Sequence, residues 1–213
     1  MGQKVNPKGF RLISNHDWDS RWFSSDKKQY RDQLASDMKV RDIVTKQTGP
    51  QAAVSRVLIE RTADIVKVKI FTGRPGMLIG RSGKGIETLT NEIKKVVSGR
   101  VEIDVVENRK PELSAAIVAQ NIGSQISRRV AYRRAVKMAI QKVMQSGALG
   151  VKVNVAGRLN GAEIARSEKF SEGVVPVSSI KENIDYYIYH ANTTYGIIGI
   201  KVWIYKRVDK EKA

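Results

Sequence analysis

The first half of the chain alternates between two spacings of hydrophobic residues. Apolar residues that recur every three or four positions predict helices, and strict alternation of apolar and polar residues predicts half-buried strands. Tyr30, Leu34 and Met38 follow the helical spacing, and Gly99 is expected to cap the second helix. In chain order the patterns predict a helix, an antiparallel hairpin of two strands, a second helix and a third strand, at residues 29–46, 54–60, 65–71, 86–97 and 101–105.

The second half begins at Asn-Arg-Lys-Pro, residues 108–111, which is predicted to join two domains. From Leu113 to Ser146 the pattern predicts two helices with a break near residues 127–130. Strands are predicted next, near residues 151–155, 174–177, 184–190 and 196–205, and the alternation of valines buries Val153. The chain is therefore expected to contain an N-terminal arm, two domains and a charged tail, at residues 1–28, 29–107, 108–206 and 207–213.

The composition narrows the class of partner. The 213 residues include 38 lysines and arginines against 21 aspartates and glutamates, a formal net charge of +17. Positive side chains in such excess repel one another, and a polyanion would neutralise them. Nucleic acid is therefore the first interpretation of the partner, and an anionic membrane surface is a poor second. No apolar run is long enough for a membrane span, and the N-terminus does not resemble a secretory signal.

The same composition excludes several kinds of chemistry. Because cysteine is absent from the sequence, disulfides, thiolate zinc sites and cysteine nucleophiles are excluded. The two histidines, His16 and His190, are too few for a His-rich metal site, and neither has sequence neighbours that indicate catalysis.

A glycine-rich turn, Gly80-Arg81-Ser82-Gly83-Lys84-Gly85, precedes the second predicted helix. Glycines let a backbone approach a ligand closely, and the free N–H groups that begin a helix favour an anion, beside which Arg81 and Lys84 add positive charge. A nucleotide-binding P-loop would need a glycine and a hydroxyl residue where Leu78 and Gly85 stand, and the dinucleotide-binding spacing is absent too. Two interpretations are left: a plain structural turn, or a KH loop that clamps about four nucleotides of RNA.

A cluster of cations lies in the second predicted domain. Arg129, Arg133 and Lys137 are spaced by four residues and are expected to form one ridge of a helix, with Arg128 and Arg134 beside them. No acidic residue is expected within reach to pair them, so RNA phosphates would relieve their mutual repulsion. The alternative interpretation is an ordinary solvated helix face.

Two further groups have two interpretations each. Arg158 and Arg166 flank a glycine-containing loop that is either an RNA contact or a surface turn. A set of aromatic residues near the C-terminus could stack on bases, but core positions are expected for most of them: Tyr186, Tyr187, Tyr189, Trp203 and Tyr205.

The context of the glycine turn favours the KH interpretation. The segment from Ile79 to Ile86 resembles the KH signature Ile-Gly-x-x-Gly-x-x-Ile at every fixed position. The order of the elements predicted in residues 29–107 also resembles the type II KH topology.

The resemblance extends over nearly the whole chain. Several longer motifs resemble, in one order, the family of small-subunit ribosomal protein three in its bacterial-type form: residues 1–7, 74–76, 109–113, 127–135, 157–166 and 193–204. This resemblance implies an α+β fold, an N-terminal type II KH domain followed by a two-helix, four-strand two-layer α/β domain. Ser82 departs from the family pattern, in which many members have a second basic or bulkier residue between the glycines, so the strength of this loop's phosphate clamp is in question.

The resemblance also implies a function. It implies a structural constituent of the head of the small ribosomal subunit, located on ribosomes of the cytoplasm or of an organelle, that binds rRNA and neighbouring ribosomal proteins. It further implies contact with mRNA at the channel by which the message enters, where Arg133, Arg134 and Lys137 match basic positions credited with unwinding structured messages. No cofactor, metal, membrane partner or catalytic residue is implied.

The expected RNA-binding residues are therefore Gly80, Arg81, Ser82, Gly83, Lys84, Arg128, Arg129, Arg133, Arg134, Lys137, Arg158 and Arg166. Two alternative functions stay open at this point. A DNA-repair lyase, an activity reported for eukaryotic relatives, would need a lysine nucleophile in a desolvated setting, which the sequence does not indicate. A free-standing KH regulator would bind RNA without joining a ribosome.

Overall fold

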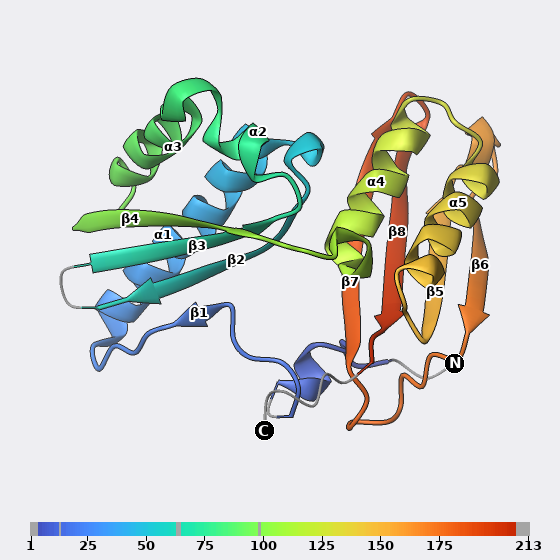
Figure 1. Ribbon diagram of the computed structural model, residues 1–213, viewed down its shortest axis with the longest axis horizontal. Helices are drawn as coiled ribbons and strands as arrows, with labels where there is room; N and C mark the ends of the chain where they lie inside the picture. The colour runs from blue at the N-terminus through green and yellow to red at the C-terminus, as the bar shows by residue number, and fades with distance from the viewer. Residues whose placement is uncertain (1–3, 13, 63–64, 98, 208–213) are drawn as a thin grey trace. The chain divides into compact units, whose positions relative to one another are not determined.

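The computed structural model describes residues 4–12, 14–62, 65–97 and 99–207 (Figure 1). They form two compact units. The first unit contains residues 18–109, and the second combines the N-terminal residues up to 17 with those from 110 onward. The expected joint at residues 108–111 contains the boundary between residues 109 and 110. The expected arm of residues 1–28 is divided, because its residues up to 17 belong to the second unit and those from 18 onward belong to the first.

The first unit is a four-stranded sheet with three helices. Its elements are β1 (Ser20–Arg21), α1 (Lys27–Thr48), β2 (Val54–Arg61), β3 (Ile65–Thr72), α2 (Pro75–Ile79), α3 (Lys84–Lys94) and β4 (Arg100–Glu107). The strand order is β1-β2-β3-β4, with β2 and β3 antiparallel and β3 and β4 parallel. This arrangement follows from the alternation in β3, where Val66, Val68 and Ile70 are buried and pack with residues of α1 and α3.

Two details of the first unit differ from the prediction. The helix α1 is present, but Val40 and Val44 face the core, whereas Tyr30, Leu34 and Met38 lie on its exposed side. Gly99 does not cap α3, because the helix ends at Lys94 and the N–H groups of the next three residues already bond to its last carbonyls.

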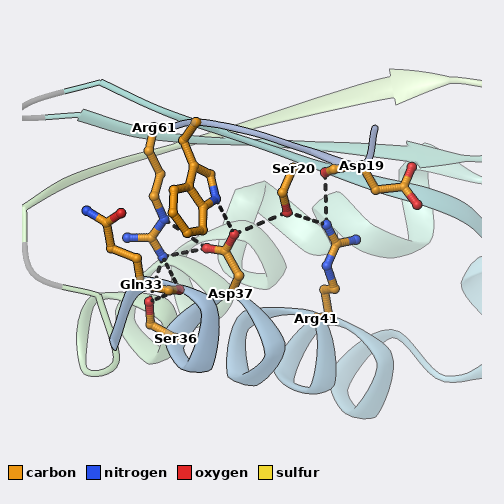
Figure 2. Close-up of polar contacts among 8 residues, drawn as sticks. Asp19, Ser20, Gln33, Ser36, Asp37, Arg41 and Arg61 are labelled. Carbon is orange, nitrogen blue, oxygen red and sulfur yellow. Dashed lines mark hydrogen bonds and ion pairs between the residues drawn. The ribbon is translucent and has the colours of Figure 1, made fainter. Parts of the chain in front are cut away.

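A buried polar network attaches the chain just before α1 to this unit (Figure 2). The carboxylate of Asp37, on α1, accepts hydrogen bonds from Ser20 Oγ at 3.1 Å, Trp22 Nε1 at 2.8 Å and Arg61 Nε at 2.8 Å. One turn further along α1, Arg41 donates to the same Ser20 hydroxyl at 2.9 Å. Because these donors come from β1, its flank and β2, the network explains why residues 18–26 belong to the first unit.

The second unit is a sheet covered by two helices on one face (Figure 1). Its elements are α4 (Ala115–Ser127), α5 (Tyr132–Gln145), β5 (Gly150–Gly157), β6 (Arg166–Gly173), β7 (Ile184–Thr193) and β8 (Gly196–Tyr205). The strand order is β6-β5-β8-β7, and all neighbours are antiparallel. Val151, Val153 and Val155 on β5 are fully buried against the helices, as the valine alternation predicts. The two-helix, four-strand layer architecture is therefore confirmed.

One predicted strand of the second unit is wrong. Residues 174–177 form a loop, and the strand that pairs with β5 at this edge of the sheet is β6, residues 166–173. An edge strand pairs on one side only and is largely exposed here, so β6 lacks the apolar alternation on which the prediction relied. The exposed side chain of Val174 shows that an apolar residue alone does not mark a strand.

The N-terminal segment, residues 4–12 and 14–17, is attached to the rest of the second unit by buried charge. Arg11 is fully buried, and its guanidinium donates to the carbonyls of Glu182 at 2.8 Å, Val177 at 2.9 Å and Ser179 at 2.7 Å. Burial lowers the pKa of this guanidinium from its usual value. Burial of a charged guanidinium is unfavourable unless several acceptors bind its N–H groups. The carbonyls of the loop before β7 are these acceptors, which explains why the segment folds back onto that loop.

Asp185, at the start of β7, completes the attachment. Its carboxylate lies 3.1 Å from Lys8 Nζ and 3.2 Å from Lys206 Nζ, and it accepts the N–H of Ala115 at the start of α4 at 3.0 Å. Burial would raise the pKa of Asp185, but the two ammonium groups and this N–H outweigh it and keep the pKa well below the usual value. The predicted tail of residues 207–213 lies, apart from Arg207, outside the described residues.

Candidate nucleic-acid interface

The backbone of the glycine turn has a shape that only glycine permits at two positions. Gly80 ends α2 with a φ of 70°, and a Cβ there would lie 3.0 Å from the backbone nitrogen of Gly85. A Cβ on Gly85, in the first turn of α3, would lie 2.4 Å from the carbonyl oxygen of Leu78. Helices α2 and α3 can therefore approach each other closely only because these residues lack side chains.

The turn presents unpaired positive charge at a helix N-terminus. No side chain caps the first turn of α3, and the backbone N–H of Lys84 donates to the carbonyl of Arg81. The side chains of Arg81, Ser82 and Lys84 are exposed and have no hydrogen-bond or ion-pair partner among the residues that the structure describes. The positive end of a helix and two unpaired cations together suit an anionic ligand such as a phosphate.

The predicted basic ridge is shorter than the sequence spacing suggested. Arg133, Arg134 and Lys137 lie exposed on α5, opposite the buried residues of the helix. Arg128 and Arg129 do not continue this ridge, because they occupy the break between α4 and α5. Arg129 has a φ of 64° there, which is not a helical conformation.

The expectation that no acid reaches the ridge is also wrong. Glu168, on β6, lies 3.0 Å from Arg133 Nη2 and accepts the hydroxyl of Tyr132 at 2.8 Å. These hydrogen bonds raise the pKa of Arg133 and lower that of Glu168. By contrast, Arg134 and Lys137 have no partner within the described part of the chain. The acid was missed because it lies on the edge strand that the sequence pattern did not reveal.

The two arginines at the second loop have structural contacts of their own. Arg158 is half-buried, and its guanidinium donates to the carbonyls of Ala162 at 2.9 Å and Tyr195 at 3.3 Å. Arg166 begins β6 and lies 3.8 Å from Glu168. Arg158 therefore shapes the loop, whereas Arg166 is an exposed cation next to an acid that Arg133 already binds.

The aromatic residues divide between the two faces of the second sheet. Tyr187 and Tyr189 pack against the core, as expected for most of the set. Tyr186 and Trp203 lie on the opposite face, with ring centroids 5.1 Å apart, and three lysines share that face: Lys152, Lys169 and Lys201. Sequence reasoning did not select these lysines, although Lys152 alternates with the buried valines of β5 and could have been assigned to the open face.

The comparisons with known proteins agree with the two units. The chain matches the model of the KH domain over residues 39–113 and that of the C-terminal domain of ribosomal protein S3 over residues 122–204. The small ribosomal subunit protein uS3 of Magnetococcus marinus is 49% identical over 212 residues, with 100% of each chain covered. The chain belongs to the uS3 family. Proteins of the same name from Xanthomonas euvesicatoria and Desulforamulus reducens are 51% and 48% identical over 97% of this chain, and the matches cover 84% and 92% of their own lengths.

Membership of the uS3 family confirms the resemblance drawn from the sequence motifs and the expected α+β fold with its KH domain. The relatives are named as ribosomal proteins, a family of structural and non-enzymatic proteins, which confirms the expectation that the chain is not an enzyme. Within the described residues no helix is long and apolar enough to cross a membrane, and no cluster of three potential metal ligands occurs.

Proposed function

We propose that the chain is a structural component of the small ribosomal subunit, located in the head of the subunit on cytoplasmic ribosomes. It binds rRNA and neighbouring ribosomal proteins there. The observation that carries this proposal is the similarity, over the full length of the chain, to a protein named as a small-subunit ribosomal protein. The formal net charge of +17 supports it, because rRNA is the polyanion that such an excess would neutralise.

The RNA-binding residues that we propose form two groups. In the first unit they are the glycine turn and its cations: Gly80, Arg81, Ser82, Gly83 and Lys84. The unpaired cations at the N-terminus of α3 support this choice, because they can bind the phosphates of a single strand. In the second unit they are the cations around α5 and the neighbouring loop: Arg128, Arg129, Arg133, Arg134, Lys137, Arg158 and Arg166.

We further propose that α5 contacts mRNA where the message enters the subunit and helps to unwind structured messages. The exposed and unpaired side chains of Arg134 and Lys137 support this role, since no internal carboxylate competes for them among the described residues. Arg133 also has a structural role, because its ion pair with Glu168 connects α5 to β6. We therefore assign the direct RNA contacts of the ridge mainly to the two unpaired cations, Arg134 and Lys137.

Two experiments test the proposal. In the first, ribosomal subunits are washed with salt and separated on a sucrose gradient, and the chain should remain with the small subunit. A free-standing KH regulator would instead stay at the top of the gradient. In the second, a message that contains 4-thiouridine is threaded through ribosomes and irradiated. Peptides from residues 132–145 should be cross-linked, and cross-links confined to other parts of the chain would contradict the mRNA contact.

A further inference from the structure

The second sheet has an open face that the helices do not cover. Because α4 and α5 both pack on the other face, the alternate residues of β5 to β8 point away from them. In the strand order β6-β5-β8-β7 these residues form four rows: Ser171-Lys152-Trp203-Tyr186, Lys169-Asn154-Lys201-Ile188, Ser167-Ala156-Gly199-His190 and Gly173-Gly150-Tyr205-Ile184. The rows contain lysines and aromatic rings but no acidic residue.

The same face is hollowed. A depression of about 500 Å³ is lined by Lys152, Trp203 and Tyr186, by the row Lys169-Asn154-Lys201-Ile188, by Val177, and by Lys4, Val5, Asn6 and Pro7 of the N-terminal segment. Lys4 thus adds a fourth ammonium group to Lys152, Lys169 and Lys201. No carboxylate lines this depression either, so its charge is entirely positive.

The lysines of the depression lack the ion pairs that the lysines at the end of the same sheet form. Lys8 and Lys206 both pair with Asp185, at 3.1 Å and 3.2 Å. Lys152, Lys169 and Lys201 have no ion pair within the described residues, although the strand register brings their backbones to within about 8–10 Å of one another. Like charges at this spacing repel, and only an anion from outside the unit can relieve the repulsion.

Aromatic surface lies beside these cations. The rings of Tyr186 and Trp203 are 5.1 Å apart and tilted by 36°, and Lys152 Nζ lies 5.6 Å from the centroid of the Trp203 ring. The cation over the ring orients Lys152 toward the depression. Phosphate-binding ammonium groups next to a ring that can contact a base or a ribose are the combination by which proteins bind single-stranded RNA.

We propose that the open face of the second sheet is an additional RNA-binding surface, which takes an unpaired segment of rRNA. Its phosphates lie against Lys152, Lys169 and Lys201, and a base or ribose lies against Trp203. RNA is favoured over a protein segment because the surface is uniformly positive and because rRNA is the anion that the proposed function brings next to it. The inference therefore rests on the proposed function.

A photo-cross-linking experiment distinguishes the occupants. The photoreactive amino acid benzoylphenylalanine replaces Ile188, which is 40% exposed at the edge of the depression, and in a control it replaces Val174, which is 70% exposed outside it. Assembled subunits that contain each variant are irradiated. A ribonuclease-sensitive adduct at position 188, stronger than at position 174, supports the proposal. A protein adduct at position 188, or no adduct there, overturns it. Sedimentation of the unmodified chain with the subunit tests the proposed function separately.

The salt dependence of RNA binding provides a second test that needs no ribosome. Lys152, Lys169 and Lys201 are all replaced by Gln in the full chain, and the affinity for single-stranded RNA is measured over a range of salt concentrations. Each phosphate contact contributes about 0.7 to the slope of log affinity against log salt, so the slope should fall by about 2. The matched control replaces Lys39, Lys94 and Lys181, which are exposed elsewhere, and should leave the slope unchanged. If the first slope is unchanged in a variant that melts like the native chain, the proposal is wrong.

Discussion

The glycine turn and helix α5 both present cations to solvent, but the chain positions these cations differently. In the turn, the backbone sets the shape, and Arg81 and Lys84 have no partner among the described residues. On α5, one arginine of the ridge is bound to Glu168 of β6, and only its neighbours are free. The number of cations in a sequence motif therefore overstates the number that an RNA can bind. Which of them are free depends on contacts between residues far apart in the chain.

The largest expected effect comes from altering the backbone of the turn. Gly85→Ala forces a Cβ to within 2.4 Å of the Leu78 carbonyl oxygen, so α2 and α3 must move apart. Overpacking of this kind costs about 1–3 kcal/mol, and we expect a lower melting temperature and weaker RNA binding. Gly76→Ala is the matched control, because a Cβ there meets no atom within 4 Å. Thermal melts of the full chain check this, and equal behaviour of the two variants would contradict the close approach.

A smaller and more selective effect is expected from charge alone. Arg81→Asp combined with Ser82→Asp should weaken the binding of single-stranded RNA by about tenfold or more, since carboxylates repel the phosphate at the start of α3. The fold should persist, because Ser82 has a φ of 54° and aspartate tolerates that conformation.

The control for this variant makes the same change in charge elsewhere. Lys39→Asp combined with Asn91→Asp alters two exposed positions away from the turn. Both variants are compared by RNA titration and by thermal melting. If the control weakens binding as much as the variant of the turn, the turn contributes only to the overall charge.

The smallest expected effect concerns the paired arginine of α5. The hydrogen bond from Arg133 lowers the pKa of Glu168, so the contact stabilises the fold above the unfolded pKa of about 4.3 and is lost as the pH falls below it. Arg133→Ala should raise the pKa of Glu168, and Arg134→Ala should leave it unchanged. An NMR titration of the Glu168 carboxyl carbon measures both. Equal shifts in the two variants would show that overall charge, and not this hydrogen bond, sets the pKa.

Much of the fold could be predicted from local patterns, because buried strands and helices repeat their apolar residues at fixed spacing. The alternation around Val153 and the signature around Gly80 predicted their elements correctly. The exposed strand β6 had no such pattern, and the stripe from Tyr30 to Met38 predicted the helix but not its buried face.

Contacts between distant residues were beyond this reasoning. Arg133 and Glu168 are 35 positions apart, and Arg11 meets the carbonyl of Glu182 across 171 positions. The first pairing depends on strand β6, which the pattern did not reveal, and the second depends on the return of the N-terminal segment to the loop before β7. The exposed cations of the site were therefore predictable as a group, whereas the division into paired and free cations was not.

The most direct test of the account uses the two free cations of α5. Ribosomes that contain the Arg134→Ala, Lys137→Ala variant in full amount translate a message with a stable hairpin ahead of the ribosome and a matched message without it. Because the apolar face of α5 and the Arg133–Glu168 contact are untouched, we expect normal incorporation into the subunit. Translation of the structured message should slow several-fold, with little change on the unstructured one. Equal rates for variant and native ribosomes on the structured message, or equal slowing on both messages, would contradict the account.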